Sequence, residues 1–391
     1  MAKNVVIPIA MQIRVDDVGW HNGRDERYRN RPSRSGLPRN HHPSDYLVLQ
    51  ELGKALDMKI GCSLVIGEWD RENVLRGVPH VTYNEEGWDR ASEIDMEYAE
   101  ECFRNLDGSE YLGYNLHGLL HSYYDAGRLV CERQFFPLVY DEEKGCYTKT
   151  YQKLPLPIFE QHLDLFYKIF NGWNFQKKIT GFASPCGCNG TPEDNADFCG
   201  ALRDRGIVCW MNGWKDCMDR PSVDVSNGIV CLRTVGAVSW EVYGADPDLL
   251  KSPYSEDAEM LFADFCFHWT NFLHYHPERN FDMLPKWIAY FNRQAEVFGV
   301  MLSRDVPFAA SQAVYYRFAK MDVTDTGCVI DMREVDACGA EALKDEFYIS
   351  LRNGTKPRIV TGGTVELYET RKEFATYKIT RDGSQTVTLQ F

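Results

Sequence analysis

The sequence contains no run of about twenty apolar residues, so no segment is expected to cross a membrane as a helix. Its start, Met1 to Lys3, leads straight into an apolar stretch. This start lacks the charged region, the longer apolar region and the cleavage site of a secretion signal. Internal repeats and low-complexity tracts are missing as well. These absences predict a cytoplasmic globular protein.

The sequence also lacks a basic excess. It has 57 acidic and 43 basic side chains, which give a formal net charge of −14. A general nucleic-acid binder or a protein that binds anionic membranes normally carries the opposite balance, so both classes are excluded.

The charge balance is reversed locally between residues 24 and 39, where six arginines stand against Asp25 and Glu26. Three interpretations are open. The segment is a solvated surface loop, or its guanidinium groups bind an anionic group of the substrate, or it meets the acidic face of another subunit in a homo-oligomer. For the second interpretation, Arg29 and Arg31 are the candidate substrate-binding residues.

The 13 cysteines are scattered and form no paired Cys-x-x-Cys framework. This pattern predicts free, reduced thiols rather than a disulfide scaffold. Cys186 and Cys188 are a weak metal signal that we interpret as structural.

Apolar stretches with strand and helix spacing alternate along most of the chain, which is typical of a parallel α/β sheet or barrel. A length of 391 residues suits a barrel of about 250 residues with a smaller addition. We therefore predict an α/β barrel over residues 1–321 and a small antiparallel β domain over 322–391. The predicted strands are 5–11, 59–66, 111–116, 179–183, 207–210 and 228–233; the predicted helices are 45–57, 96–106, 157–170, 194–205, 257–266, 284–298 and 310–319.

Within the predicted β domain, Asn353-Gly354 and Asp382-Gly383 are each flanked by strand-like segments. Such dipeptides favour tight hairpins. The sequence therefore predicts hairpins that join 346–351 to 358–361 and 376–380 to 385–391.

Asp16 and Asp17 lie shortly after the first predicted strand. Adjacent carboxylates repel each other, and strands are depleted in Asp. Because side chains alternate across a strand, at most one of the two keeps a regular position. This arrangement suits one Asp that holds a metal ion and a neighbour that handles a proton. The alternative is a solvated turn with a helix cap.

His117 and His121 follow the third predicted strand. If their segment forms a helical turn, the four-residue spacing places both imidazoles on one face, where they can bind one divalent metal ion. An Asp from the end of the first strand would complete a set of two histidines and one carboxylate. Such a set leaves a coordination position open, as catalytic zinc sites require.

Four segments together resemble the motifs of the NodB-homology polysaccharide deacetylases, over residues 5–320. They are Asp16-Asp17, His117-Gly-Leu-Leu-His121, Ala183-Ser-Pro185-Cys-Gly187 and His276-Pro277-Glu278. The resemblance implies an irregular (β/α)7 barrel. It also implies that Asp17, His117 and His121 bind the metal, most simply Zn²⁺, that Asp16 is the general base and that His276 is the catalytic acid.

His274 lies on the same side of an extended segment as His276, so it stays an alternative for the acid. We interpret His268 as an aromatic-rich core position. The resemblance places Pro185, Cys186 and Gly187 in the substrate site, and Trp214 is a candidate for stacking on a sugar face. One position departs from the family: its third motif begins with an arginine that orients the base, and here that residue is Ala183.

The expected function is a metal-dependent hydrolase that removes an acetyl group, bound as an amide or ester, from a carbohydrate or another small substrate. Two alternatives are open. One is a hydrolase of a different C–N bond, such as a cyclic amide, on the same fold. The other is a non-catalytic carbohydrate-binding protein with a degenerate site.

Overall fold

A computed structural model describes residues 5–19, 35, 37, 39–212, 221–236, 238, 242–252, 261–352, 356–357 and 359–391. Seven parallel strands form a closed barrel in the order β10-β9-β4-β3-β2-β13-β12, and the pairing of β10 with β12 closes the ring. The predicted α/β barrel is confirmed. The barrel strands are β2 (Ala10–Val18), β3 (Ile60–Leu64), β4 (Leu112–Leu116), β9 (Ile179–Phe182), β10 (Cys209–Asn212), β12 (Ile229–Gly236) and β13 (Asp264–His268).

Two short strands extend the barrel wall. β11 (Val223–Ser226) pairs antiparallel with β12, and β14 (Met301–Leu302) pairs parallel with β2. Two hairpins follow β4, and Gly145 lies in the turn of the second. They are formed by β5 (Tyr123–Asp125) with β6 (Arg128–Cys131) and by β7 (Leu138–Asp141) with β8 (Cys146–Tyr151).

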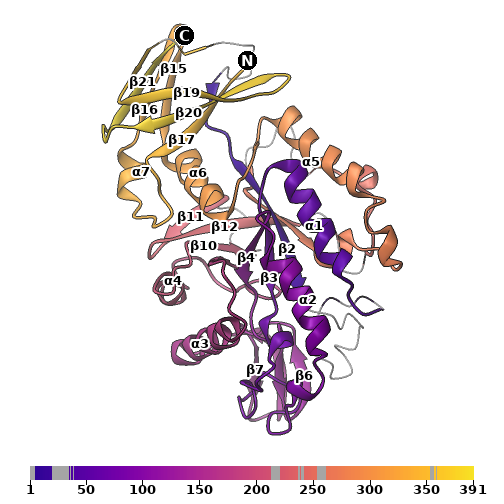
Figure 1. Ribbon diagram of the computed structural model, residues 1–391. Helices are drawn as coiled ribbons and strands as arrows, with labels where there is room; N and C mark the ends of the chain where they lie inside the picture. Colours follow the sequence, from indigo (N-terminus) through magenta and orange to yellow (C-terminus); the bar gives the residue numbers. More distant parts are fainter. Residues whose placement is uncertain are drawn as a thin grey trace.

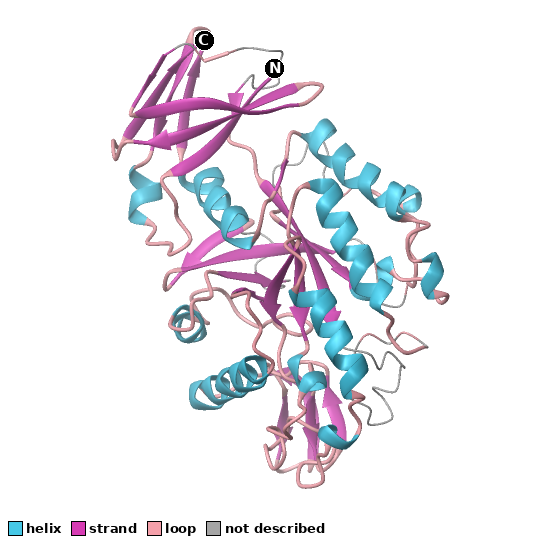
Figure 2. Ribbon diagram, in the orientation of Figure 1, coloured by secondary structure: helices cyan, strands magenta, loops and turns pink. Residues whose placement is uncertain are grey.

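Amphipathic helices cover the outside of the barrel (Figures 1 and 2). In α1 (Pro43–Leu56), for example, Tyr46, Leu49, Leu52 and Leu56 recur at helical spacing and are all buried. None of the helices in the described ranges is both long enough and apolar enough to span a membrane. The other helices are α2 (Met96–Asp107), α3 (Leu156–Gly172), α4 (Ala196–Arg203), α5 (Leu284–Phe298), α6 (Val306–Phe318) and α7 (Arg333–Ala337), with 3-10 turns η2 (Ile66–Trp69), η3 (Arg90–Ser92), η5 (Pro247–Leu249), η6 (Trp269–Phe272) and η7 (Pro277–Arg279).

Two four-stranded antiparallel sheets follow the barrel, at the top of Figure 1, and α6 lies between them and the barrel strands. One sheet has the order β1-β17-β20-β19 and the other β15-β16-β21-β18. The boundary at residue 321 stays a prediction, and β1 near the N-terminus belongs to the first of these sheets. The strands are β1 (Val5–Val6), β15 (Lys320–Thr324), β16 (Gly327–Asp331), β17 (Glu346–Arg352), β18 (Ile359–Thr361), β19 (Gly363–Thr370), β20 (Phe374–Arg381) and β21 (Thr386–Gln390).

Both predicted hairpins of this region are wrong. β17 pairs with β20 and β1 instead of β18, and β18 pairs with β21. β20 and β21, which flank Asp382-Gly383, lie in different sheets. Instead of pairing with their neighbours in sequence, these strands bury their apolar faces against partners that are more distant in sequence.

Two predicted elements of the barrel also need correction. The first barrel strand is 10–18, so the two aspartates lie inside a strand and not after one. The helix predicted over 257–266 is wrong where the structure describes it, because residues 264–268 form β13. Both corrections change which side chains reach the end of the barrel.

We predict that Gly53→Ala destabilises the protein, because α1 packs closely on the barrel at this residue. A Cβ at Gly53 would lie 2.7 Å from the carbonyl oxygens of Met58 and Tyr111, both of which are backbone atoms that cannot swing aside. We expect a loss of about 1–3 kcal/mol in the free energy of unfolding, measured by urea titration. The control is Gly236→Ala, where no described heavy atom lies within 4 Å of the added carbon. Equal unfolding free energies for the two variants would contradict the close packing.

Candidate metal centre

The two aspartates reach the same end of the barrel because β2 is irregular there. Asp17 has a φ of 63°, in the left-handed region that non-glycine residues rarely adopt. The register of β2 against β3 shifts between Val15 and Val18, as at a β-bulge. A regular strand would direct Asp16 and Asp17 to opposite faces. The irregular backbone instead leaves both side chains buried at the carboxyl end of the barrel.

The two histidines lie on an irregular loop after β4 and not on a helical turn. The loop turns back through positive φ angles of 86° at Gly118 and 67° at His121. Gly118 is required there, because a Cβ would lie 2.5 Å from Oε1 of Gln134. That same oxygen accepts a hydrogen bond of 2.8 Å from the backbone N–H of Leu119. The loop, rather than a helix, brings the two imidazoles together.

Asp17, His117 and His121 form a buried group whose nitrogen and oxygen ligand atoms all lie within 4.8 Å of one another. Oδ1 of Asp17 is 3.6 Å from Nε2 of each histidine, which is too long for a direct hydrogen bond. Nδ1 of His117 donates a hydrogen bond of 2.7 Å to the carbonyl of Ala183. This bond leaves Nε2 on the side of Asp17, as in histidines that bind a metal ion through that nitrogen. The donor set fits a divalent cation.

Arg14 points into the barrel and pairs with two carboxylates. Its Nε donates to both oxygens of Asp264, at 3.0 and 3.1 Å, and its Nη1 donates to Asp16. Nη2 donates to the hydroxyl of Thr234 at 3.2 Å. Ala183 stands where the resemblance leads one to expect an arginine that orients the base. Arg14, on the first barrel strand, pairs with the carboxylate of Asp16, which the resemblance implies as that base.

Asp16 is held as a carboxylate by its neighbours. Burial alone would raise its pKa, but the charges of Arg14, His117 and His268, in that order, outweigh burial and lower it. Sγ of Cys266 also lies 3.3 Å from Oδ2 of Asp16. A buried, ionised carboxylate beside a potential metal site is chemically suited to accept a proton.

His268 ends β13 and lies directly opposite Asp16 in the parallel register of β13 with β2. The sequence analysis interpreted His268 as an aromatic-rich core position, and the helix predicted over 257–266 concealed the strand that His268 ends. The signal is present in Asp264-Phe-Cys-Phe-His268, where polar and aromatic residues alternate with the period of a strand. Asp264, Cys266 and His268 share one face, which the contacts with Arg14 and Asp16 place inside the barrel.

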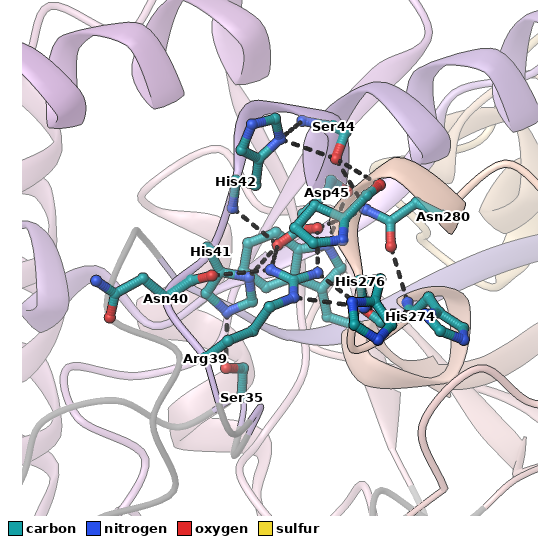
Figure 3. A network of polar contacts seen from close by, with 12 residues as sticks. Ser35, Arg39, Asn40, His41, His42, Ser44, Asp45, His274, His276 and Asn280 are labelled. Carbon is teal, nitrogen blue, oxygen red and sulfur yellow. Dashed lines mark hydrogen bonds and ion pairs between the residues drawn. The ribbon is translucent and has the colours of Figure 1, made fainter.

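His274 and His276 lie farther along, in the segment between η6 and η7. His276 is exposed, with Nδ1 3.9 Å from the carboxylate of Glu278, and its backbone N–H donates to Nδ1 of His274 at 2.9 Å. Figure 3 shows both histidines next to the side chains of Arg39 and Asp45. Their predicted catalytic role stays a prediction.

That segment is held by a polar network at the start of α1 (Figure 3). Arg39 donates to the carbonyl of His274 at 2.9 and 3.2 Å and to both oxygens of Asp45 at 2.8 and 2.9 Å. Asn280 donates to Asp45 at 2.6 Å and accepts from the backbone N–H of His274 at 2.8 Å. The network therefore fixes the chain that leaves β13 against α1.

His41 completes this network. Burial lowers its pKa, so the ring is neutral: Nδ1 donates to Asp45 at 2.8 Å and Nε2 accepts from the hydroxyl of Ser35 at 2.7 Å. The ring stacks on Trp269 with the centroids 3.7 Å apart, and the indole N–H of Trp269 donates to the carbonyl of Asp45. Because Trp269 directly follows His268, the network also constrains the position of that histidine.

The predicted substrate-binding residues are placed only in part. Pro185 is buried beside the loop that carries His117 and His121. Its Cγ lies 3.3 Å from the place that a Cβ would take if Gly118 had one. Cys186 is exposed, and both Cys186 and Gly187 have positive φ angles, of 51° and 90°. The remaining candidates, Arg29, Arg31 and Trp214, lie outside the described residues.

No model of a known protein family matches the sequence, and no curated protein matches it either. Among solved structures, the chain is similar to a family 4 carbohydrate esterase from Streptomyces lividans in complex with acetate. The identity is 10%, the TM-score is 0.30, and the match covers 75% of this chain and 92% of that chain. A likeness at this level says nothing about activity, so the chemistry of the site is inferred from its own residues.

We predict that Asp45→Asn lowers the free energy of unfolding by about 3 kcal/mol at neutral pH, because it leaves Arg39, whose side chain is only 12% exposed, without its charged partner. Burial opposes ionisation of Asp45, but hydrogen bonds from His41 and Arg39 lower its pKa well below the usual range. Its contribution is therefore present above the unfolded pKa of about 4 and is lost as the pH falls further.

Urea titrations of both proteins between neutral and acidic pH measure this difference. The control is Asp282→Asn, at an exposed carboxylate that pairs with Arg279 on the surface, where the change should stay within about 0.5 kcal/mol. A difference between wild type and Asp45→Asn that does not shrink on acidification would contradict the assigned charge.

Proposed function

We propose that this protein is a metal-dependent hydrolase that removes an acetyl group from a carbohydrate. The observation that carries the proposal is the buried group of Asp17, His117 and His121 at the carboxyl end of the barrel, with the ionised Asp16 next to it. Active sites of (β/α) barrels lie at this end. The choice of an acetylated carbohydrate rests on the resemblance of the sequence motifs, and Zn²⁺ is the cation that two histidines and one carboxylate suit best.

Asp17, His117 and His121 would hold the cation, which supplies Lewis acidity toward a carbonyl oxygen and lowers the pKa of water. In the proposed reaction, Asp16 accepts a proton from the water that attacks the acetyl carbon. Arg14 orients the Asp16 carboxylate during this transfer. His268 then donates a proton to the leaving amine or alkoxide, and acetate is the second product.

We assign the role of catalytic acid to His268 instead of His276 because of where the two side chains lie relative to Asp16. His268 lies opposite Asp16 across the β2–β13 pair, and its charge acts on Asp16. His276 is exposed and interacts with Glu278 and His274. An acid must reach the leaving group while the base reaches the water, so the two must lie close to the same carbonyl.

The first test is metal content. Wild-type protein loaded with Zn²⁺ and desalted should retain about one ion per chain in elemental analysis. Asp17→Asn and His117→Ala should each weaken retention more than about 100-fold, because even partners outside the ligand set change affinity by about 10–100-fold. His80→Ala removes a half-buried histidine elsewhere and should leave retention unchanged. If wild-type protein never retains a divalent cation, the hydrolase proposal is wrong.

The second test separates the two acids. His268→Gln should lower kcat for acetate release from a panel of acetylated sugars by about 10²–10⁴-fold with zinc retention intact, whereas His276→Gln should change it less than about twofold. The reverse result would assign the role of catalytic acid to His276. If metal-loaded wild-type protein opens cyclic amides but releases no acetate, its reaction is the hydrolysis of a different C–N bond. Sugar binding without any hydrolysis would indicate a binding protein.

A further inference from the structure

A cavity of about 210 Å³ opens at the other end of the barrel, away from the metal centre. It lies at the amino ends of β3, β4 and β9, beside the first turn of α6. Its lining combines lysines with a partly apolar wall: Lys59, Gly61, Leu112, Gly113, Tyr114, Lys177, Lys178, Thr180, Asp305, Val306 and Pro307.

Three lysines, Lys59, Lys177 and Lys178, line this cavity in a chain whose net charge is −14. Lys177 is the most enclosed of them: its Nζ donates to the carbonyl of Leu106 at 2.8 Å and lies 5.1 Å from the centroid of the Tyr114 ring. Lys59 and Lys178 are exposed at the opening. Like charges brought together repel each other, and an anion between them would relieve that repulsion.

Two glycines line the cavity, and the missing side chain of Gly113 leaves space in it. Gly61 and Gly113 are direct partners in the β3–β4 register, and both line the cavity. A Cβ on Gly113 would meet nothing closer than 3.7 Å, the distance to Cβ of Lys59. The backbone around Lys59 is fixed, because its N–H donates to the carbonyl of Arg304 at 2.8 Å and its carbonyl accepts from Gln12.

The one acidic side chain in the lining is already engaged. Asp305 caps α6, and its carboxylate accepts a hydrogen bond of 2.9 Å from the backbone N–H of Phe308. Pro307 has no N–H to offer. Recognition of an anion at this position therefore depends on the lysine side chains and not on free amides of the helix.

We propose that this cavity binds a small molecule that carries a tetrahedral oxyanion, a sulfate or phosphate group. The oxyanion lies among the ammonium groups of Lys59, Lys177 and Lys178, and Leu112, Tyr114 and Val306 contact the rest of the molecule. The site is independent of the metal centre, which lies at the opposite ends of the same strands.

Sulfate is the probe, titrated calorimetrically into chloride-free protein at constant ionic strength. The experiment uses metal-free His117→Ala protein as its background, so that sulfate cannot coordinate a cation. Lys177→Met in this background should weaken sulfate binding at least about tenfold, since a charge-assisted hydrogen bond contributes about 1.5–3 kcal/mol. The control Lys149→Met makes the same change of net charge on β8 and should bind sulfate like the background protein.

Gly113→Leu tests the cavity itself, because it fills the space and keeps every lysine. It should abolish binding while circular dichroism shows a folded protein. Equal affinities for Lys177→Met and Lys149→Met would overturn the proposal, as would a folded Gly113→Leu that binds sulfate normally. If Gly113→Leu does not fold, the comparison of Lys177→Met with Lys149→Met decides whether the proposal holds. Inorganic phosphate and an organic phosphate ester, titrated next, distinguish a free anion from a larger ligand.

The pH dependence gives an independent readout. Burial, helped by repulsion from Lys59, lowers the pKa of Lys177 to about 8, while Cys62 and Asp107 act in the opposite direction. Lys178, Tyr114 and Asp305 also line the cavity. Sulfate binds the protonated amine, so its affinity should rise as the pH falls through about 8. This rise should be absent in Lys177→Met.

Discussion

A single guanidinium group, that of Arg14, holds the charges inside the barrel together. It lies between Asp264 and Asp16 and is almost completely buried with them. A carboxylate that lost this partner would stay in the barrel uncompensated, and breaking a buried ion pair destabilises a protein by about 3–5 kcal/mol. The pairing requires β2 and β13 to be neighbours, and their register also places His268 opposite Asp16. Strand order and the chemistry of the site thus depend on the same contact.

The interior of the barrel is accordingly polar, whereas such barrels are usually filled by branched apolar side chains. Asp16, Asp17 and Asp264 together bring three carboxylates, and Arg14 compensates one charge. Burial raises the pKa of Asp264, although Arg14 and Thr234 oppose that rise. A divalent cation at Asp17 would compensate the remaining negative charge. The geometry of Asp17, His117 and His121 is compatible with a cation at this place.

The two ends of the barrel differ for a reason that lies in the backbone. At the carboxyl ends, irregular turns with positive φ at Asp17, Gly118 and His121 direct several polar side chains to one point. At the amino ends, paired glycines in β3 and β4 leave room, and lysines surround it. The segment that leaves β13 is fixed by Arg39 and Asp45 on α1, so the rim of the metal centre is held by a helix rather than by a free loop.

The sequence by itself determined the α/β barrel, because hydrophobic periodicity is a local property. The resemblance of its short motifs implied the set of Asp17, His117 and His121, and the structure brings these side chains together. Predictions from local sequence patterns failed where the interacting residues are distant in the sequence. The dipeptides at 353–354 and 382–383 predicted hairpins, yet β17 pairs with β20, which is farther away in the sequence than β18. Arg14 and Asp264 are 250 residues apart, and His268, which the sequence analysis interpreted as a core position, ends a strand that was predicted in part as a helix. Only the closed barrel, in which the first strand pairs with the last parallel strands, decides which charges share one buried volume.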